Sequence, residues 1–598
     1  MENKLPKRSE VPVEMTWRLT DIYETEELWN EDYKTAGLLA DEIREYEGRV
    51  CESADTMLKV FDLYEACLMK VYRLYGYAHM MHDQDTADQK NQGLHSKAMS
   101  LDVMVGEKLA FLEPEVLSLD KEKVDAFYEE NEALKKYKCL ITEMMRTREH
   151  TLDKNLEALL ASAGDMAETA QKAFSSLAYA DLKFPETKNE KGEQVALSNG
   201  RFVPLQMSAD REVRKEAFFK FYERYKEFAN TWAVLYDGQV KKQIFYAKAR
   251  KYNSTYEAAV DRNNVSPSVC ENLISCVNKN LDKMHRYVRL RKKLLGYDEL
   301  HMYDVYASMV SEFEWKVSFE EAKKMSLEAL RPLGEDYLKI LEEAYENRWI
   351  DVIENEGKRG GAYSSGVYGV HPYVLLNWSG TLDDVFTLVH EMGHSLHTYY
   401  SNKKQSFFDA DYKIFVAEVA STTNEILLLK YLLGRAKEVK EKMYLINHFL
   451  ESFKGTLYRQ TMFAEFEKES NRLSEEGTPL TADVLSELYL SLNKKYFGEE
   501  MISDPLIAYE WCRIPHFYYN FYVYQYATSF SASVAIADRI LTGGKDEVAR
   551  YLDFLSSGCT ADPVSLLKKA GVDLSTEEPV QKALDIFDGL ITEMDEIN

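Results

Sequence analysis

The sequence predicts a mainly α-helical protein, and two features of the chain carry this prediction. Proline is rare, with 13 among 598 residues, and none lies between Pro12 and Pro114 or between Pro114 and Pro185. Such long tracts, rich in Leu, Ala, Glu and Lys, favour helix. Apolar residues also recur every three or four positions among charged ones in residues 208–230, which is typical of an amphipathic helix. The same spacing predicts helices in residues 320–345, 410–435 and 440–470.

Two segments break the helical pattern. Residues 182–204 place turn-forming residues between short apolar runs, which predicts a β-hairpin. Residues 357–380 are rich in glycine and then become apolar, which predicts tight turns followed by a strand of a small β-sheet beside the next helix. Pro372 begins that apolar run, and because proline donates no ladder hydrogen bond we expect an edge strand.

The length of the chain predicts more than one domain. Boundaries are expected near residue 115 and near residues 190–205. We therefore divide the chain into residues 1–114, residues 115–200, which end in the hairpin, and residues 201–598.

Composition excludes several classes of function. The formal net charge is −26, and a surface this acidic repels nucleic acid and anionic lipid, so neither is an expected partner. The seven cysteines form no CxxC pair, which argues against a disulfide framework or a thiolate metal site. The chain shows no signal-peptide pattern and no apolar run of about 18 residues, so we expect a cytoplasmic protein.

The most informative motif is DDVFTLVHEMGHSLH, from Asp383 to His397. On a helix His390 and His394 lie one turn apart on one face, so both imidazoles can reach one metal ion. Glu391 lies beside that face, where it can accept a proton from a metal-bound water as hydroxide attacks a carbonyl. The alternative is a solvated amphipathic helix with two incidental histidines. The apolar FTLV run before the motif and the glutamates downstream favour the metal site.

His397 is not expected to bind the same ion as its neighbours. It lies about 10.5 Å along the helix from His390, whereas zinc ligands lie about 2 Å from the metal. We interpret it as a packing or supporting residue. The metzincin pattern requires glycine and histidine where this chain has His397 and Tyr400, so that subclass is excluded. The phosphate-binding glycine motifs and the GxSxG motif are absent from the sequence as well.

The helix predicted over residues 410–435 offers two candidates for a third ligand. Glu418 and Glu425 are seven positions apart, so they share one face of a strongly apolar helix. A carboxylate buried there is costly unless it is paired or binds a metal. Both carboxylates would be accounted for if one of them binds the metal and the other accepts a hydrogen bond that orients an imidazole. The spacing alone leaves the two assignments open.

At this point a resemblance to a known family is evident. The motifs HEMGHSLH and FVAEVASTTNE resemble those of the oligoendopeptidase F branch of the thimet oligopeptidase family of zinc peptidases. The segments GKRGGAYSSG, HPYVLLNW and WCRIPHFYYNFYVYQYATS are similar to that branch as well. The resemblance extends over about residues 115–585, and the first hundred residues fit its helical N-terminal part.

The resemblance implies one zinc ion per chain, bound by His390, His394 and Glu418, with Glu425 as the supporting carboxylate. It also implies two helical halves that enclose a deep channel, which admits oligopeptides and excludes folded proteins. In these terms residues 115–200 correspond to the N-terminal type of domain of this branch. Residues 201–598 correspond to the zinc peptidase domain.

An aromatic stretch follows much later in the chain, with five tyrosines between positions 518 and 526. One interpretation is a helix that packs Tyr519, Tyr522 and Tyr526 into the core. The resemblance instead implies a histidine and tyrosines that face the zinc and donate hydrogen bonds to the developing oxyanion. His516 matches that histidine, and both Tyr522 and Tyr524 are candidates for the tyrosine.

These observations together predict a zinc-dependent endopeptidase that hydrolyses internal bonds of short peptides. We expect the substrate to pair as a strand with the edge around Tyr373 and Asn377. An exopeptidase of the carboxypeptidase or dipeptidyl type on the same scaffold is the first alternative. A non-catalytic zinc-containing peptide-binding protein is the second, and the presence of Glu391 argues against it. The sequence does not specify an oligomeric state.

Overall fold

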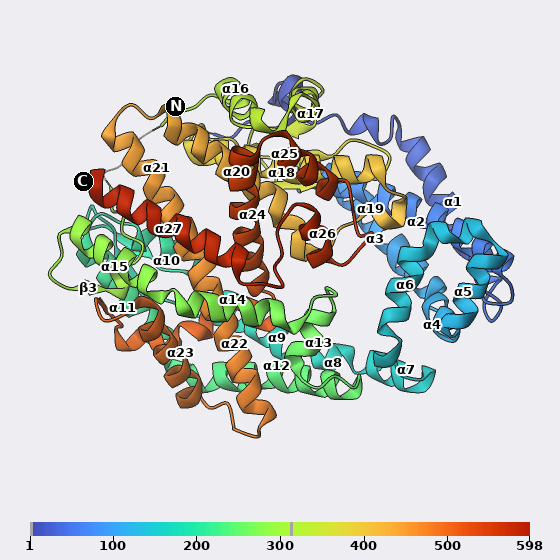
Figure 1. Ribbon diagram of the computed structural model, residues 1–598, viewed down its shortest axis with the longest axis horizontal. Coiled ribbons are helices and arrows are strands. Elements are labelled where there is room, and N and C mark those ends of the chain that lie inside the picture. The colour runs from blue at the N-terminus through green and yellow to red at the C-terminus, as the bar shows by residue number, and fades with distance from the viewer. Residues whose placement is uncertain (1–3, 311–314, 598) are drawn as a thin grey trace. The chain divides into compact units, whose positions relative to one another are not determined.

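The structure, a computed structural model, describes residues 4–310 and 315–597, and within them helices dominate (Figure 1). The predicted fold class is confirmed, since the strands are few and short. None of the described helices combines the length and the apolar character needed to cross a bilayer.

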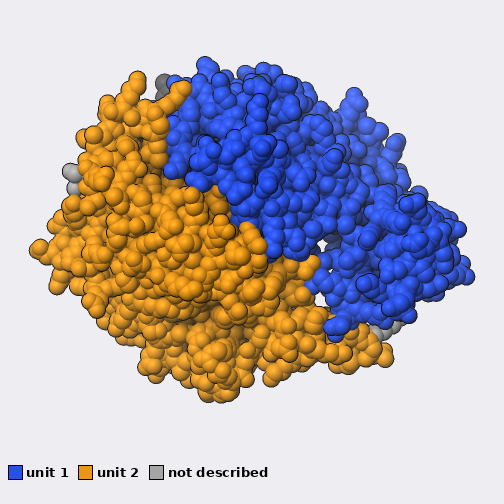
Figure 2. All heavy atoms as spheres, in the orientation of Figure 1, with its two compact units in different colours: residues 1–149, 314–431, 536–572 blue, residues 150–313, 432–535, 573–598 orange. Residues whose placement is uncertain are grey.

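The chain forms two compact units, and each is built from three separate segments (Figure 2). Unit 1 comprises residues 1–149, 314–431 and 536–572. Unit 2 comprises residues 150–313, 432–535 and 573–598.

The α-helices of residues 4–310 are α1 (Glu26–Arg44), α2 (Ala54–Asp83), α3 (Gln89–Leu109), α4 (Leu112–Leu117), α5 (Lys121–Glu130), α6 (Lys138–Arg146), α7 (Lys154–Ser162), α8 (Gly164–Ala167), α9 (Thr169–Ser175), α10 (Asn199–Gln206), α11 (Arg211–Glu227), α12 (Ala229–Ala249), α13 (Thr255–Asp261), α14 (Pro267–Lys279) and α15 (Leu281–Leu295). Those of residues 315–597 are α16 (Phe319–Ala329), α17 (Glu335–Glu346), α18 (Leu382–Lys404), α19 (Phe407–Ala410), α20 (Ile414–Arg435), α21 (Val439–Ser452), α22 (Arg459–Glu475), α23 (Ala482–Phe497), α24 (Tyr524–Gly543), α25 (Lys545–Leu555), α26 (Pro563–Lys569) and α27 (Glu578–Ile597).

The strands are β1 (Glu186–Lys188), β2 (Gln194–Ala196), β3 (Leu300–His301), β4 (Ile350–Asp351), β5 (Tyr363–Ser365), β6 (Tyr373–Leu375) and β7 (Met501–Ile502). The short 3₁₀ and π-helical segments are η1 (Arg8–Glu10), η2 (Val13–Met15), η3 (Leu19–Asp21), η4 (Glu132–Tyr137), η5 (Thr147–His150), η6 (Ser176–Asp181), η7 (Met302–Asp304), η8 (Arg331–Leu333), η9 (Phe453–Tyr458), η10 (Pro505–Arg513) and η11 (Pro515–Tyr518).

The predicted helices are present, with one exception. Residues 208–230 contain α11, residues 410–435 contain α20, and residues 440–470 contain α21 and α22 joined by the π-helical η9. The exception is residues 320–345, where the predicted helical structure is present but is interrupted between α16 and α17. Proline within η8 and the φ of 93° at Gly334 end the first helix and redirect the chain.

Both predicted β-regions form strands, but their positions differ from the prediction in one respect. β1 and β2 pair antiparallel as the expected hairpin. In the second region β6 lies between β4 and β5, so the prediction of an edge strand is wrong. Pro372 directly precedes β6, outside the ladder, and its missing N–H therefore removes no ladder bond. The edge positions belong to β4 and β5.

Helix α18, which carries the histidine motif, begins at a well-formed cap. The side chain of Thr381 accepts a hydrogen bond from the Asp384 amide, and the carboxylate of Asp384 accepts one from the Thr381 amide. This capping box satisfies two backbone donors that a helix start leaves unpaired. In unit 1 the helix packs against β5, β6, α17 and α25, so its orientation is held along its length.

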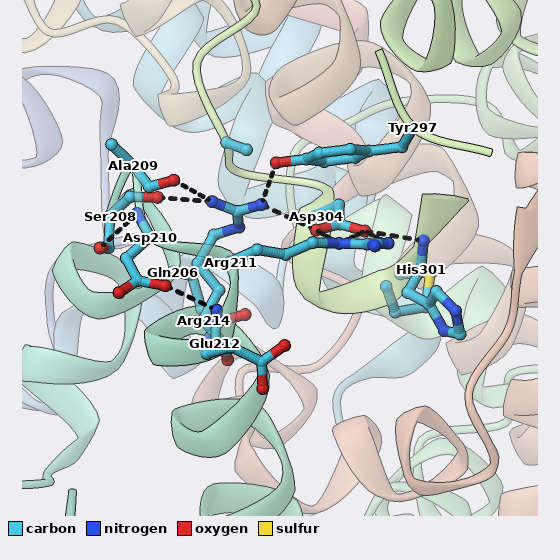
Figure 3. A network of polar contacts seen from close by, with 12 residues as sticks. Gln206, Ser208, Ala209, Asp210, Arg211, Glu212, Arg214, Tyr297, His301 and Asp304 are labelled. Atoms are coloured by element: carbon cyan, nitrogen blue, oxygen red, sulfur yellow. Dashed lines mark hydrogen bonds and ion pairs between the residues drawn. The ribbon is translucent and has the colours of Figure 1, made fainter. Parts of the chain in front are cut away.

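Unit 2 contains a buried ion network that joins α11 to η7 (Figure 3). Asp304 is fully buried and accepts hydrogen bonds from Arg211 at 2.8 Å and from Arg214 at 2.9 Å. Arg214 also donates to the Tyr297 hydroxyl at 2.9 Å. Buried charges are tolerable only when they are paired in this way, so the network specifies how these two elements meet.

Candidate metal centre

Helices α18 and α20 bring three potential metal ligands together in unit 1. The Nε2 atoms of His390 and His394 lie 3.2 Å apart. Each of them lies 3.4 Å from Oε2 of Glu418. Within residues 4–310 and 315–597, these three residues form the only group of three or more such side chains whose donor atoms all lie within 4.8 Å of one another.

This spacing fits a metal ion. Ligands arranged tetrahedrally at bond lengths of about 2.0–2.1 Å lie about 3.3–3.4 Å from one another. The three observed separations fall at that value. Two imidazole nitrogens and one carboxylate oxygen form a donor set typical of zinc sites. The arrangement could therefore hold one metal ion and leave a fourth position for water or substrate.

The structure gives different contacts to Glu418 and Glu425, whose roles the sequence spacing left open. Glu425 accepts a hydrogen bond from Nδ1 of His390, the ring nitrogen that does not belong to the donor group. Such a contact holds the proton on Nδ1 of the neutral imidazole and leaves the lone pair of Nε2 available to bind a metal ion. Burial lowers the pKa of His390, but the hydrogen bond and charge of Glu425 outweigh it and raise the pKa to about 9. Glu418 is oriented by Ser421, whose hydroxyl donates to its Oε2 at 3.0 Å.

Glu391 lies next to the donor group but is not part of it. Its side chain is buried, with 7% of the residue exposed. Burial raises the pKa of its carboxyl above the usual value, although the neighbouring histidines His390 and His394 oppose this change. A carboxylate with a raised pKa is a stronger base, and it can return the proton later in a reaction.

His397 is a packing residue, as expected. It is 1% exposed and stacks on Tyr412 with ring centroids 3.7 Å apart. Burial lowers its pKa to about 3, so the imidazole is neutral at physiological pH. Phe554 of α25 contacts its other side.

Gly393 explains how α18 and α20 approach so closely. A Cβ atom at this position would lie 2.6 Å from Cα of Ser421 and 2.7 Å from the carbonyl oxygen of Ala420. Contacts that short with backbone do not occur, so only glycine permits this packing. Sequence reasoning missed this residue. The detectable signal was a glycine inside a strongly helical pattern, which usually has a packing reason.

The two residues expected to bind substrate have other contacts here. Tyr373 is fully buried, in the core that also contains Trp17, and its backbone belongs to the central strand β6. Asn377 donates two hydrogen bonds, to the carbonyl oxygens of Arg359 and Gly361, and so supports the glycine-rich loop before β5. β5 itself lies against α18, where the Ser364 hydroxyl contacts that of Ser395 at 2.8 Å.

The aromatic stretch from His516 to Tyr526 does not form one helix that packs into the core. His516 lies in η11, and the chain then runs irregularly to the start of α24. The rings of His516 and Tyr522 stack at 6.3 Å, and Tyr519 and Tyr526 contact both of them. Tyr519 is 45% exposed, so packing into the core is wrong for this cluster. Tyr524 lies outside the cluster and is buried.

Comparison with known proteins identifies close relatives. Residues 205–586 match the family described as Peptidase family M3, and residues 115–184 match the one described as Oligopeptidase F. Oligopeptidase PepF of Bacillus subtilis is 47% identical over 595 residues, which cover 100% of this chain and 89% of the relative. Group B oligopeptidase PepB of Streptococcus agalactiae is 39% identical over 99% of this chain and 98% of the relative.

Solved structures agree with these matches. The crystal structure of oligoendopeptidase-F from Enterococcus faecium has a TM-score of 0.74 at 36% identity and covers 96% of this chain and 99% of that one. A crystal structure from Chlamydophila abortus has a TM-score of 0.93, also at 36% identity, and covers both chains completely.

The contact at Gly393 yields a prediction. Gly393→Ala should push α18 and α20 apart, cost about 1–3 kcal/mol of stability through overpacking, and weaken metal binding about 10–100-fold. Thermal unfolding and titration with a chromophoric chelator measure the two effects. Gly434→Ala on α20 is the control, because a Cβ there meets nothing within 4 Å. Equal metal affinity in both variants would refute the packing argument.

Proposed function

This chain belongs to peptidase family M3 and is an oligopeptide-cleaving metallopeptidase; from this premise we propose that its metal ion is zinc and that it cleaves internal peptide bonds with Glu391 as general base. One observation carries the proposal. Three donor atoms of His390, His394 and Glu418 lie 3.2–3.4 Å apart, the separation that a tetrahedral zinc site requires.

The chemistry of the reaction divides between the metal and the chain. His390, His394 and Glu418 would hold a zinc ion, which would supply a Lewis acid that makes a water molecule more acidic and polarises the scissile carbonyl. Glu391 accepts the proton of that water as its oxygen bonds to the carbonyl carbon. The same carboxyl then gives the proton to the amide nitrogen as the C–N bond breaks, so protons balance over one turnover. Its buried position and raised pKa support both transfers.

We assign stabilisation of the oxyanion to His516 and Tyr522. Both side chains offer a polar hydrogen, and donors held in place before the reaction are the most effective stabilisers of developing charge. The stacked rings and partial exposure of the pair support this role. Tyr524 is the weaker candidate, since it is 1% exposed within unit 2.

The substrate is proposed to add a strand to β5. This strand lies at the edge of its sheet, and one side of its backbone pairs with β6. Ser364 contacts Ser395, which directly follows the proposed ligand His394 on α18. Main-chain pairing of this kind holds a peptide with little dependence on its side chains.

The general base yields a second prediction. Glu391→Gln should keep a full complement of zinc and lose about 10²–10⁴-fold in kcat, because the amide cannot accept a proton. Metal content by mass spectrometry and turnover of a quenched fluorescent peptide are measured on the same preparation. Asp383→Asn, at an exposed position in the first turn of α18, serves as control. Near-normal turnover of the Gln variant would exclude Glu391 as the base.

A third prediction separates the two glutamates of α20. Glu418→Ala should abolish tight zinc binding because it removes a ligand. Glu425→Ala should weaken binding only about 10–100-fold, as loss of a supporting contact does. Competition with a fluorescent zinc indicator gives both affinities. If Glu425→Ala proves the more damaging, the two roles have to be exchanged.

The fourth prediction concerns substrate length. We expect cleavage of peptides of about 5–20 residues, while a folded protein and a denatured chain of about 100 residues survive in the same tube, because we propose that this chain, like the relatives named oligopeptidases, acts on short peptides. A short flexible peptide loses only its own conformational entropy on binding, whereas a folded protein has to unfold locally first. Peptides blocked at both ends should be cut internally, and a chelator should stop all cleavage. Mass spectrometry of the products decides. Cleavage only at free termini would favour an exopeptidase. Rapid digestion of the long denatured chain would favour a general protease.

A further inference from the structure

The segment between His516 and α24 contains a strained turn. Asn520 and Phe521 both adopt left-handed backbone conformations, with φ of 59° and 54°. Residues other than glycine disfavour this region, and a bulky side chain such as that of Phe is rare there. Such a conformation persists only where surrounding structure enforces it. The turn directly precedes Tyr522, so it determines where that ring lies.

One buried side chain contacts the strained backbone directly. Glu467 of α22 is not exposed at all, and its Oε1 accepts a hydrogen bond from the Phe521 amide at 2.5 Å. Two weaker contacts hold the neighbouring carbonyl oxygens. Gln239 donates to that of Tyr518 at 3.0 Å, and Arg262 donates to that of Asn520 at 3.4 Å. All of these residues belong to unit 2.

The position of Glu467 is otherwise costly. Its second oxygen, Oε2, is buried and has no hydrogen-bond partner among the residues that the structure describes. Burial raises the pKa of the carboxyl to about 8, although the Phe521 amide and the charge of Arg262 lower it, so the neutral acid predominates at pH 7. An apolar residue of similar size would fill this space without a desolvation cost. An apolar residue could not, however, accept the hydrogen bond from the Phe521 amide.

We propose that Glu467 is a positioning residue for peptide hydrolysis, which holds the left-handed turn at Asn520–Phe521 and thereby sets the rings of Tyr522 and His516 face to face. The inference rests on the proposed role of these two residues in stabilising the oxyanion. Glu467 contacts neither metal ligands nor substrate, and it acts through the backbone of Phe521.

Two substitutions separate the contact from the space that the side chain fills. Glu467→Leu removes the acceptor, and we expect kcat to fall about 10–100-fold, the scale of a small misplacement of a catalytic group, with KM and zinc content unchanged. Glu467→Gln keeps an acceptor oxygen and resembles the neutral acid, so it should restore nearly full activity. Ser470→Ala is the matched control, because it removes a fully buried hydroxyl of the same helix that bonds Tyr236 and the backbone carbonyl of Glu467 but leaves the acceptor of the Phe521 amide in place.

A double-mutant cycle shows whether Glu467 acts through Tyr522. If it does, Glu467→Leu combined with Tyr522→Phe should reduce kcat little more than the stronger single change, since effects within one coupled unit do not add. Hydrogen exchange measured by mass spectrometry on peptides covering residues 515–526 reports the turn itself. Exchange should rise in Glu467→Leu, and it should stay at the level of the unmodified protein in Glu467→Gln and Ser470→Ala.

The outcomes test the positioning role of Glu467 separately from the proposed role of His516 and Tyr522 in stabilising the oxyanion. Unchanged exchange and unchanged kcat in Glu467→Leu would overturn the inference, and so would fully additive effects with Tyr522→Phe. An equal loss in Glu467→Gln and Glu467→Leu would overturn it as well, because a retained acceptor should rescue. If Tyr522→Phe and His516→Gln both leave kcat unchanged, the oxyanion assignment is wrong, and the catalytic role of Glu467 is rejected with it.

Discussion

The metal centre depends on one close contact between the backbones of α18 and α20. Gly393 lies against Ser421 without any side chain between them. One hydrogen bond secures the same approach, since the side chain of Asn424 on α20 donates to the carbonyl oxygen of Val389 on α18. The hydroxyl of Tyr337 on α17 donates to the same Asn424 side chain and so holds it in place. The reach of imidazole and carboxylate side chains is short, so ligands from two helices can meet at one point only when the helices nearly touch.

Within this contact, three carboxyl groups acquire different properties from their surroundings. Burial raises the pKa of both Glu391 and Glu418, but the hydrogen bond and charge of His394 lower that of Glu418 to about 2. Glu425 forms a hydrogen bond and an ion pair with Nδ1 of His390. A carboxyl that stays ionised suits a cation, and one with a raised pKa suits proton transfer. Chemically identical side chains thus separate into different roles through their neighbours alone.

What could be predicted from the sequence was local in origin. The positions of His390 and His394 follow from helical periodicity, and so does the shared face of Glu418 and Glu425. The central position of β6 was beyond reach, because it depends on pairing with β4, a segment that no local pattern identified. The left-handed turn at Phe521 was equally hidden, since it depends on a glutamate more than fifty residues earlier in the chain. The break at Gly334 did have a local signal, in Pro332 and the glycine itself, and the apolar spacing on both sides concealed it.

The interleaving of the two units has a consequence for how the protein is made. Helices α18 and α20 belong to unit 1, but α25, whose Phe554 covers His397, is reached only after the chain has passed through much of unit 2. During synthesis from the N-terminus, β5, β6 and α17 are made before α18, whereas the contact of α18 with α25 has to wait until α21 to α24 have emerged from the ribosome. His397 therefore lacks the cover of Phe554 until late in synthesis. The donor group of His390, His394 and Glu418 lies on two helices that are close in sequence, whereas each unit needs segments from distant parts of the chain to complete its core.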